Sequence, residues 1–303
     1  MFPYLKYFLI GFCALAFGGD VALAANNANA ALKSVTAPKF TKGLLWKIET
    51  SNIKPSFLFG TIHTDDTRVI ALPEPVAKAL DNSNLFAMEA LIDGDALVQM
   101  AEAMYFNDGK TLQQVIGKAL YDEVLQILAK HGLPTAGVEK QKPWAVIMML
   151  SMPPPKTGLF FDLVLENLAT QQNKPITGLE TISEQIAVFN ELPLEEQTLL
   201  LQETLRSYKD FDQAIEELIQ AYLARDLKRL GEITEKHEPG DDRLYQKIMD
   251  RLLVTRNTRM LTRMTSLLKQ GNAFIAVGAA HLPGDTGLLN LLEKAGYRVT
   301  PVY

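Results

Sequence analysis

Two apolar segments near opposite ends of the chain each run into the pattern Gly-x-x-His, and no other feature constrains the fold as strongly. The first reads FLFGTIH and ends at His63, and the second reads FIAVGAAH and ends at His281, 218 positions later. A glycine directly after a buried strand permits a close backbone approach or an unusual φ, which makes Gly60 and Gly278 candidate site positions. Histidines at strand ends lie where α/β proteins build their sites. We therefore expect both segments to be strands of one sheet whose edge brings the two histidines together.

The other strand-like segments also lie towards the two ends of the chain. A polar turn separates the apolar segments 44–48 and 57–62, which predicts an antiparallel hairpin. Strands are also expected at 273–277 and 298–302, whereas 85–88 (LFAM) is compatible with a strand or with a buried helix. Strands at both ends with helices between them favour an α/β fold with a central mixed β-sheet, in which the N- and C-terminal halves meet.

The middle of the chain shows the apolar spacing of helices and predicts a large helical insertion at about 100–268. Thr111 and Gln114 form a capping box at the start of one of these helices. The most charged stretch, 193–237, predicts two or three solvent-facing helices that form a cap or arm. Helices are expected at 73–80, 112–118, 121–130, 143–152, 159–171, from 183 onwards, at 244–268 and at 288–294.

The N-terminal residues read as a secretory signal peptide at 1–24. Lys6 supplies a positive start, an apolar core of limited length follows, and Ala22-Leu23-Ala24 is a small-x-small cleavage site. An uncleaved anchor is the alternative, but the apolar core is short for a membrane span. Residues 25–42 are rich in Asn and Ala and predict a flexible lead-in to a folded body at 43–303. We expect a periplasmic or secreted protein without a stable membrane span after cleavage.

The charge of the chain argues against nucleic-acid binding, and its cysteine content excludes disulfides within the chain and cysteine-based zinc sites. Lys and Arg total 30 against 35 Asp and Glu, a net charge of −5, whereas nucleic-acid-binding proteins usually carry a basic surplus. Cys13 is the single cysteine, so the chain has neither an intramolecular disulfide nor a cysteine-based zinc site. Its loss with the signal peptide suits an oxidising compartment. We expect no nucleic-acid partner, and the oligomeric state stays open.

His63 and His281 are two of four histidines, and each alone could be a structural side chain satisfied by one hydrogen bond. Two imidazoles with a carboxylate, however, make a ligand set for a divalent metal ion that leaves positions for water and substrate. Mn, Co, Zn and Fe all accept such ligands, so the identity of the metal stays open. The other two histidines, His131 and His237, lie at predicted helix ends, where a dipole or cap role is expected.

The chain resembles the TraB/GumN family, which includes the TIKI-type metalloproteases. GTIH at 60–63 and GAAHLPGD at 278–285 carry the resemblance, which extends over most of 44–303. The resemblance implies a sheet of two related halves with a helical insertion, and metal-dependent hydrolysis centred on His63, His281 and Glu89. Supporting matches are Met88-Glu89, Lys142-Pro143-Trp144, Phe161-Asp162, Gly178-Leu179-Glu180-Thr181 with Gln185, Arg256-Asn257 and Gly296-Tyr297.

This resemblance implies roles for three carboxylates. Glu89 would be the third metal ligand or the general base that takes a proton from bound water. Glu180 would be a ligand or a partner that holds a histidine tautomer, or else a helix N-terminal carboxylate. Asp162 is a further candidate site residue. Because it lies early in a predicted helix, it has the same alternative of a helix N-terminal carboxylate.

Arg256 would steady a carboxylate or polarise a scissile carbonyl. The alternative is an exposed cation on a helix rich in arginine. Asp65 and Asp66 would widen the metal site or cap the following backbone.

Two hypotheses of different classes follow. The first is a secreted or periplasmic metal-dependent hydrolase that resembles a peptidase and takes a peptide or protein substrate. The second is a non-catalytic periplasmic binding protein for haem or a polysaccharide-related ligand, in which the histidines would hold the ligand and no bond would break.

Overall fold

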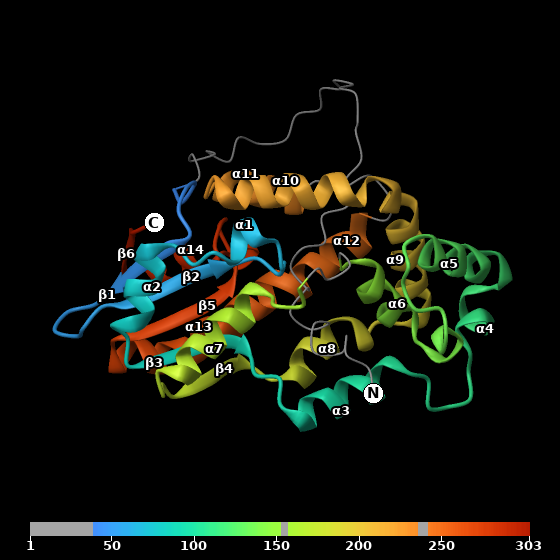
Figure 1. Cartoon of the computed structure of the whole chain (residues 1–303), viewed down its shortest axis with the longest axis horizontal. Helices are drawn as coiled ribbons and strands as arrows, with labels where there is room; N and C mark the ends of the chain where they lie inside the picture. Colours follow the sequence, from blue (N-terminus) through green and yellow to red (C-terminus); the bar gives the residue numbers. More distant parts are fainter. Residues whose placement is uncertain (1–38, 153–156, 236–241) are drawn as a thin grey trace, which may run out of the picture.

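The computed structural model describes residues 39–152, 157–235 and 242–303 (Figure 1). The predicted signal peptide, residues 25–38 of the lead-in and His237 lie outside these ranges. The end of the lead-in differs from the prediction, because it is packed against the folded body. Phe40 is buried with its ring edge-on to Trp46, and Lys42 forms a β-bridge with Asp226. Burial of an aromatic side chain fixes this part of the chain.

The centre of the molecule is one mixed sheet with the strand order β4-β3-β5-β2-β1-β6. Strands β2, β3, β4 and β5 pair in parallel, whereas β1 pairs antiparallel with both β2 and β6. The predicted hairpin, the two C-terminal strands and the mixed sheet are confirmed, while a relation between the two halves of the sheet stays a prediction. The strands are β1 (Leu45–Glu49), β2 (Ser56–Thr61), β3 (Leu85–Ala90), β4 (Ile176–Glu180), β5 (Ala273–Gly278) and β6 (Arg298–Pro301).

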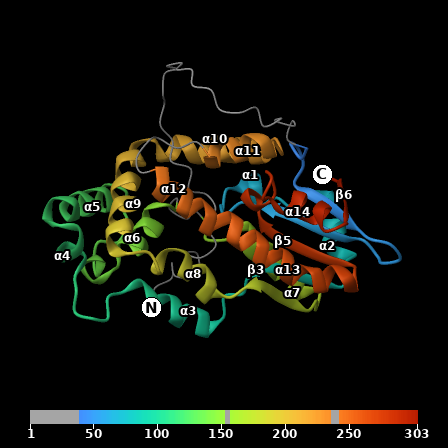
Figure 2. The same ribbon diagram turned by 180° about the vertical axis from the view of Figure 1, so that it is seen from behind.

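Helices cover both faces of this sheet. The chain crosses from β3 to β4 with α7 (Phe161–Gln171), and returns over β3 to β5 with α13 (Thr255–Gln270). Parallel crossovers are right-handed, so connections in opposite directions place these two helices on opposite faces of the sheet. The two views agree, with α7 in front in Figure 1 and α13 in front in Figure 2. The remaining helices against this part of the molecule are α1 (Thr67–Ile70), α2 (Glu74–Asp81), α10 (Phe211–Leu223), α11 (Leu227–Glu235) and α14 (Leu288–Lys294).

A second hydrophobic core lies among helices beside one end of the sheet. One of these helices begins with the predicted capping box, in which Thr111 and Gln114 bond reciprocally. Trp144 and the methionines Met148 and Met149 are buried here as core residues. The helices of this lobe are α3 (Gly94–Met104), α4 (Leu112–Ile116), α5 (Lys118–Lys130), α6 (Pro143–Leu150), α8 (Ile182–Asn190), α9 (Leu194–Ser207) and α12 (Asp242–Met249).

The described part of the charged stretch, 193–235, forms helices as predicted, but these are not mainly solvent-facing. Helix α10 buries Leu218, Ile219 and Tyr222, and the Tyr222 hydroxyl donates to the Gly60 carbonyl at 2.8 Å. The charged residues occupy the outer face of each helix, and the apolar spacing forms the inner face. Helices α10 and α11 of this stretch therefore pack against the sheet beside the first Gly-x-x-His motif, whereas α9 belongs to the second hydrophobic core.

The predicted long helix at 244–268 is present with one change of winding. Helices α12 and α13 are joined by a π-helical turn, Asp250–Val254, directly before Arg256. Such turns shift the helix face that follows them. Within the described ranges, no helix has the length and apolar character that a membrane crossing requires.

Candidate active site

The two Gly-x-x-His motifs lie side by side at one edge of the sheet. Strands β2 and β5 are parallel neighbours, with Thr61 opposite Gly278 in the register. Neither Gly60 nor Gly278 has a positive φ, so close approach is the reason for a glycine at position 60. A Cβ there would come within 3.1 Å of the Ala279 backbone and 2.7 Å of a Leu282 methyl. The missing side chain thus lets the turn that carries His281 pack onto the first motif.

His63 is held by a carboxylate from the first turn of α7, Asp162. Its Nδ1 lies 2.8 Å from Asp162 Oδ2, and the Thr61 hydroxyl donates to the other Asp162 oxygen at 2.7 Å. Burial lowers the pKa of His63, but the charge and hydrogen bond of Asp162 outweigh it and leave the pKa above its ordinary value. Because a carboxylate accepts, Nδ1 is protonated and Nε2 carries the lone pair in the neutral ring.

His281 is fully buried and has a neutral partner instead. Its Nδ1 lies 2.6 Å from Asn257 Oδ1, while the Asn257 amide nitrogen donates to the Thr286 carbonyl at 2.8 Å. This second bond orients the Asn257 oxygen towards the ring, which assigns the proton to Nδ1. Burial lowers the pKa of His281 to about 3, so the ring is neutral. Its Nε2 faces Glu89 Oε1 at 3.6 Å.

Glu89 comes from the end of β3, the strand on the other side of β5. Its Oε1 accepts the Gly278 backbone N–H at 2.6 Å, and its Oε2 accepts Arg256 Nη2 at 2.5 Å. Burial raises the pKa of Glu89, but the charge of Arg256 and the hydrogen bond from the Gly278 backbone outweigh it and hold the pKa well below its usual range. Glu89 is therefore a carboxylate with a fixed direction, and a weak base.

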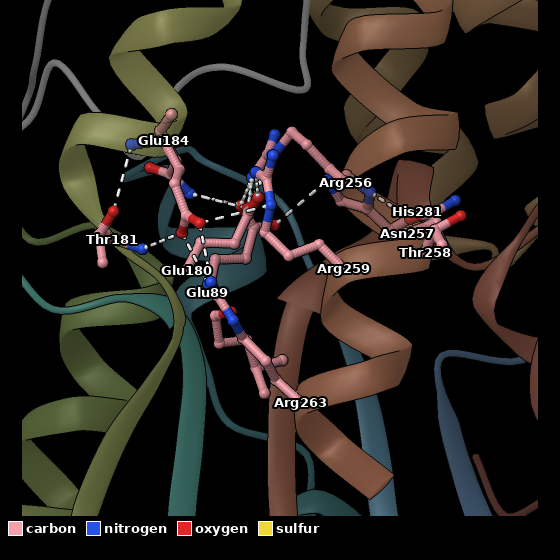
Figure 3. A network of polar contacts seen from close by, with 12 residues as sticks. Glu89, Glu180, Thr181, Glu184, Arg256, Asn257, Thr258, Arg259, Arg263 and His281 are labelled. Atoms are coloured by element: carbon pink, nitrogen blue, oxygen red, sulfur yellow. Dashed lines mark hydrogen bonds and ion pairs between the residues drawn. The ribbon is translucent and has the colours of Figure 1, made fainter.

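Arg256 and Glu180 form a buried ion pair next to Glu89. Arg256 Nε donates to Glu180 Oε2 at 2.8 Å, and the side chains are 1% and 0% exposed. The alternative of Arg256 as an exposed helix cation is therefore wrong. Glu180 directly precedes Thr181, the N-cap of α8, so it lies at a helix N-terminus as one alternative expected, but its oxygens bond to Arg256 and Arg259 of α13. Arg256 steadies carboxylates, as one of its two predicted roles requires (Figure 3).

Asp65 and Asp66 support loops. Asp66 caps α1 by accepting the Arg68 backbone N–H, and Asp65 accepts the backbone N–H groups of Thr157 and Gly158. Asp162 lies in the first turn of α7, yet its oxygens bond to His63 and Thr61. This geometry favours the partner role for Asp162 over a helix-dipole role.

Two residues near the site had no role predicted from sequence. Asn257 orients His281, and Arg259 donates to Glu180 at 2.8 Å. Asn257 had one local signal, since asparagine is a poor helix former and its presence in the middle of the helix predicted at 244–268 indicates a use for its side chain. Arg259 had none that separates it from its arginine neighbours on α13.

The donor set fits a divalent cation in part. Across residues 39–152, 157–235 and 242–303, no three His, Cys, Asp or Glu side chains already stand together as a ligand group. His281 Nε2 and Glu89 Oε1, however, are 3.6 Å apart. Two ligands of one tetrahedral ion, each about 2.1 Å from it, are about 3.4 Å apart. Both histidines also present the tautomer that a metal requires.

The chain is similar in sequence to several known proteins. The chain is 25% identical to the metalloprotease TIKI2 of Danio rerio, over 86% of this chain and 61% of the relative. It is 25% identical to the metalloprotease TIKI1 of Homo sapiens, over 99% of this chain and 69% of the relative. The uncharacterized protein YbaP of Shigella flexneri is 25% identical over 78% of this chain and 88% of the relative.

The chain spans about three fifths of the length of the TIKI2 relatives it matches. No solved structure matches it significantly. The model of the TraB/PrgY/gumN family matches residues 44–301, which is the whole sheet with both Gly-x-x-His motifs and the helices between them. This protein therefore belongs to the TraB/PrgY/gumN family.

Proposed function

We propose that the protein is a divalent-metal-dependent hydrolase. His63 Nε2, His281 Nε2 and a Glu89 oxygen would hold the ion. The observation that carries this proposal is the arrangement of His281 and Glu89: His281 Nε2 lies 3.6 Å from Glu89 Oε1, while Asn257 bonds to the other ring nitrogen. A bound divalent ion would lower the pKa of a water molecule to about 7 and so supply a nucleophile at neutral pH.

The chain's own residues prepare this site. Asp162 and Asn257 fix the histidine tautomers, so that each Nε2 points its lone pair away from the supporting hydrogen bond. Arg256 and the Gly278 N–H keep Glu89 ionised and aimed. Because these bonds make Glu89 a weak base, they favour its role as a ligand over its role as the general base.

The substrate proposed is a peptide or protein, cleaved outside the cytoplasm after removal of the signal peptide. The TIKI relatives carry the name metalloprotease, which favours peptide bonds over other hydrolysable groups. The rival function, haem binding through the histidines, would require an imidazole nitrogen with open space in front of it for a porphyrin. The fully buried ring of His281 and its contact with Glu89 weigh against that.

A digestion screen tests the hydrolase directly. The protein is incubated with a random peptide library and with Mn²⁺, Co²⁺, Zn²⁺ or Fe²⁺ in turn, and products are identified by mass spectrometry. We expect cleavage that a chelator abolishes and that His281→Ala removes. His131→Ala is the matched control, because this histidine ends α5 and packs against Tyr208, and it should leave cleavage unchanged. Cleavage that survives both chelator and His281→Ala would contradict the proposal.

A further inference from the structure

Charged side chains of alternating sign run from Glu89 to the surface along one face of α13. Arg256, Arg259 and Arg263 are spaced by three and four residues, which places them on one side of the helix. Glutamates from three other elements alternate with them, as Figure 3 shows. These are Glu89 at the end of β3, Glu180 at the end of β4 and Glu184 in the first turn of α8.

The inner part of this series is out of contact with solvent. The side chains of Arg256 and Glu180 are 1% and 0% exposed, whereas those of Arg259 and Arg263 are 28% and 41% exposed. A buried carboxylate depends on its partners for stability, because desolvation of an unpaired charge costs several kcal/mol. The partners of Glu180 therefore decide where this carboxylate lies.

The two oxygens of Glu180 are bound by different arginines. Oε2 accepts from Arg256, with contacts of 2.8 Å to Nε and 2.7 Å to Nη2, and Oε1 accepts Arg259 Nη1 at 2.8 Å. The same Nη2 of Arg256 bonds to Glu89. If Arg259 is lost, Oε1 of a fully buried carboxylate loses its cation, and we expect Glu180 to rotate. This rotation removes part of the support that fixes the Arg256 guanidinium.

We propose that Arg259 is a positioning residue that acts on Glu89 through Glu180 and Arg256. Its place at the rim of the site lets a partly exposed side chain determine the direction of a buried ligand. The expected consequence for metal affinity rests on the proposed function, since Glu89 is one of the proposed metal ligands. The position of Glu89 can also be followed in the metal-free protein by exchange of the Gly278 amide, because the Gly278 backbone N–H donates to Glu89 at 2.6 Å.

The experiment compares Arg259→Gln with Arg263→Gln. Arg263 lies one turn further along the same face, but its hydrogen bonds go to Glu184 and to the Leu179 carbonyl, whereas Arg259 bonds to Glu180. Two quantities are measured: amide exchange at Gly278 without metal, by NMR, and affinity for Zn²⁺ alone, by calorimetry. We expect faster Gly278 exchange and about tenfold weaker Zn²⁺ binding for Arg259→Gln, with both unchanged for Arg263→Gln.

The conservative variants Arg259→Lys and Arg263→Lys keep the test valid if Arg259→Gln does not fold. Lysine keeps the positive charge, but a single ammonium cannot reproduce the guanidinium that reaches both Glu180 and Glu184. Arg259→Lys should therefore speed Gly278 exchange, but by less than Arg259→Gln. Arg263→Lys should match the wild type.

Equal Gly278 exchange in the Arg259 and Arg263 variants, with similar losses of thermal stability, would show that Arg259 only stabilises the fold and would overturn the inference. A wild-type protein that binds no divalent ion would overturn the proposed function instead. In that case, Gly278 exchange still decides whether Arg259 positions Glu89.

Discussion

At the scale of single residues, the site depends on which nitrogen of each histidine carries the proton. Asp162 and Asn257 both accept from Nδ1, but they differ in charge. The carboxylate leaves the pKa of His63 raised, whereas burial beside the neutral amide lowers that of His281 to about 3. Sequence reasoning identified both histidines and Asp162 as candidates. It gave Asn257 no role, because the orientation of that amide depends on its contact with the Thr286 carbonyl, far along the chain.

Asp162→Asn tests the orientation of His63. The amide can turn its nitrogen towards the ring, so Nδ1 is no longer held protonated, and Zn²⁺ affinity should fall about 10- to 100-fold. Calorimetric titration at pH 7 measures it. Asp65→Asn is the matched control, since Asp65 is also buried but bonds to the backbone of Thr157 and Gly158. Equal affinity in both variants would remove Asp162 from the site.

At the scale of elements, the close packing of the two motifs explains one of the glycines. The turn Ala279–His281 lies directly against β2 and needs the space that a Cβ at Gly60 would fill. The sequence predicted a close approach or an unusual φ without choosing between them. The choice depends on the neighbouring strand, which local sequence does not reveal.

Gly60→Ala should therefore destabilise the protein by about 1–2 kcal/mol and displace His281, because the Ala279 backbone must move by a few tenths of an ångström. Chemical denaturation measures the loss of stability. Gly94→Ala is the control, as a Cβ at Gly94 meets nothing within 4 Å, and it should be neutral or slightly stabilising. A Gly60→Ala protein as stable as Gly94→Ala would show that the turn does not need this space.

The contact between α13 and α8 gives a pH dependence of stability. The hydrogen bond from Arg263 holds the pKa of Glu184 at about 2, below its ordinary 4.5. A lowered folded-state pKa means that the pair stabilises the protein above pH 4.5 and that this contribution is lost as the pH falls towards about 2. The effect should be below about 1 kcal/mol, because both side chains are partly exposed.

Urea denaturation at pH 6 and pH 3 measures this contribution. Arg263→Gln should be less stable than the wild type at pH 6, and the difference should shrink at pH 3. Gln213 and Glu217 offer a control, because Gln213→Ala removes an exposed hydrogen bond to a carboxylate without removing a charge. A wild-type advantage that stays constant between the two pH values would contradict the assignment to Glu184.

At the scale of the whole molecule, the ends of the chain were easier to predict than its middle. The hairpin of β1 and β2 and the strands β5 and β6 followed from short apolar runs bounded by turns. Segment 85–88 was ambiguous because its residue types fit a strand and a helix. The structure makes it β3, with parallel partners on both sides, and burial between two strands is a tertiary property. The helices at 193–237 were predicted, but their buried face was underestimated because charge dominates the composition of the segment.

The whole-molecule arrangement brings three elements from distant parts of the chain to one edge of the sheet: the end of β2, the end of β3 and the turn after β5. The claim that this edge holds one metal ion is the centre of the account, and metal analysis after purification without chelator tests it most directly. We predict about one divalent ion per chain in the wild type and its loss in both His63→Ala and His281→Ala, with both variants still folded. A metal content that is unchanged in the two folded variants would contradict the account.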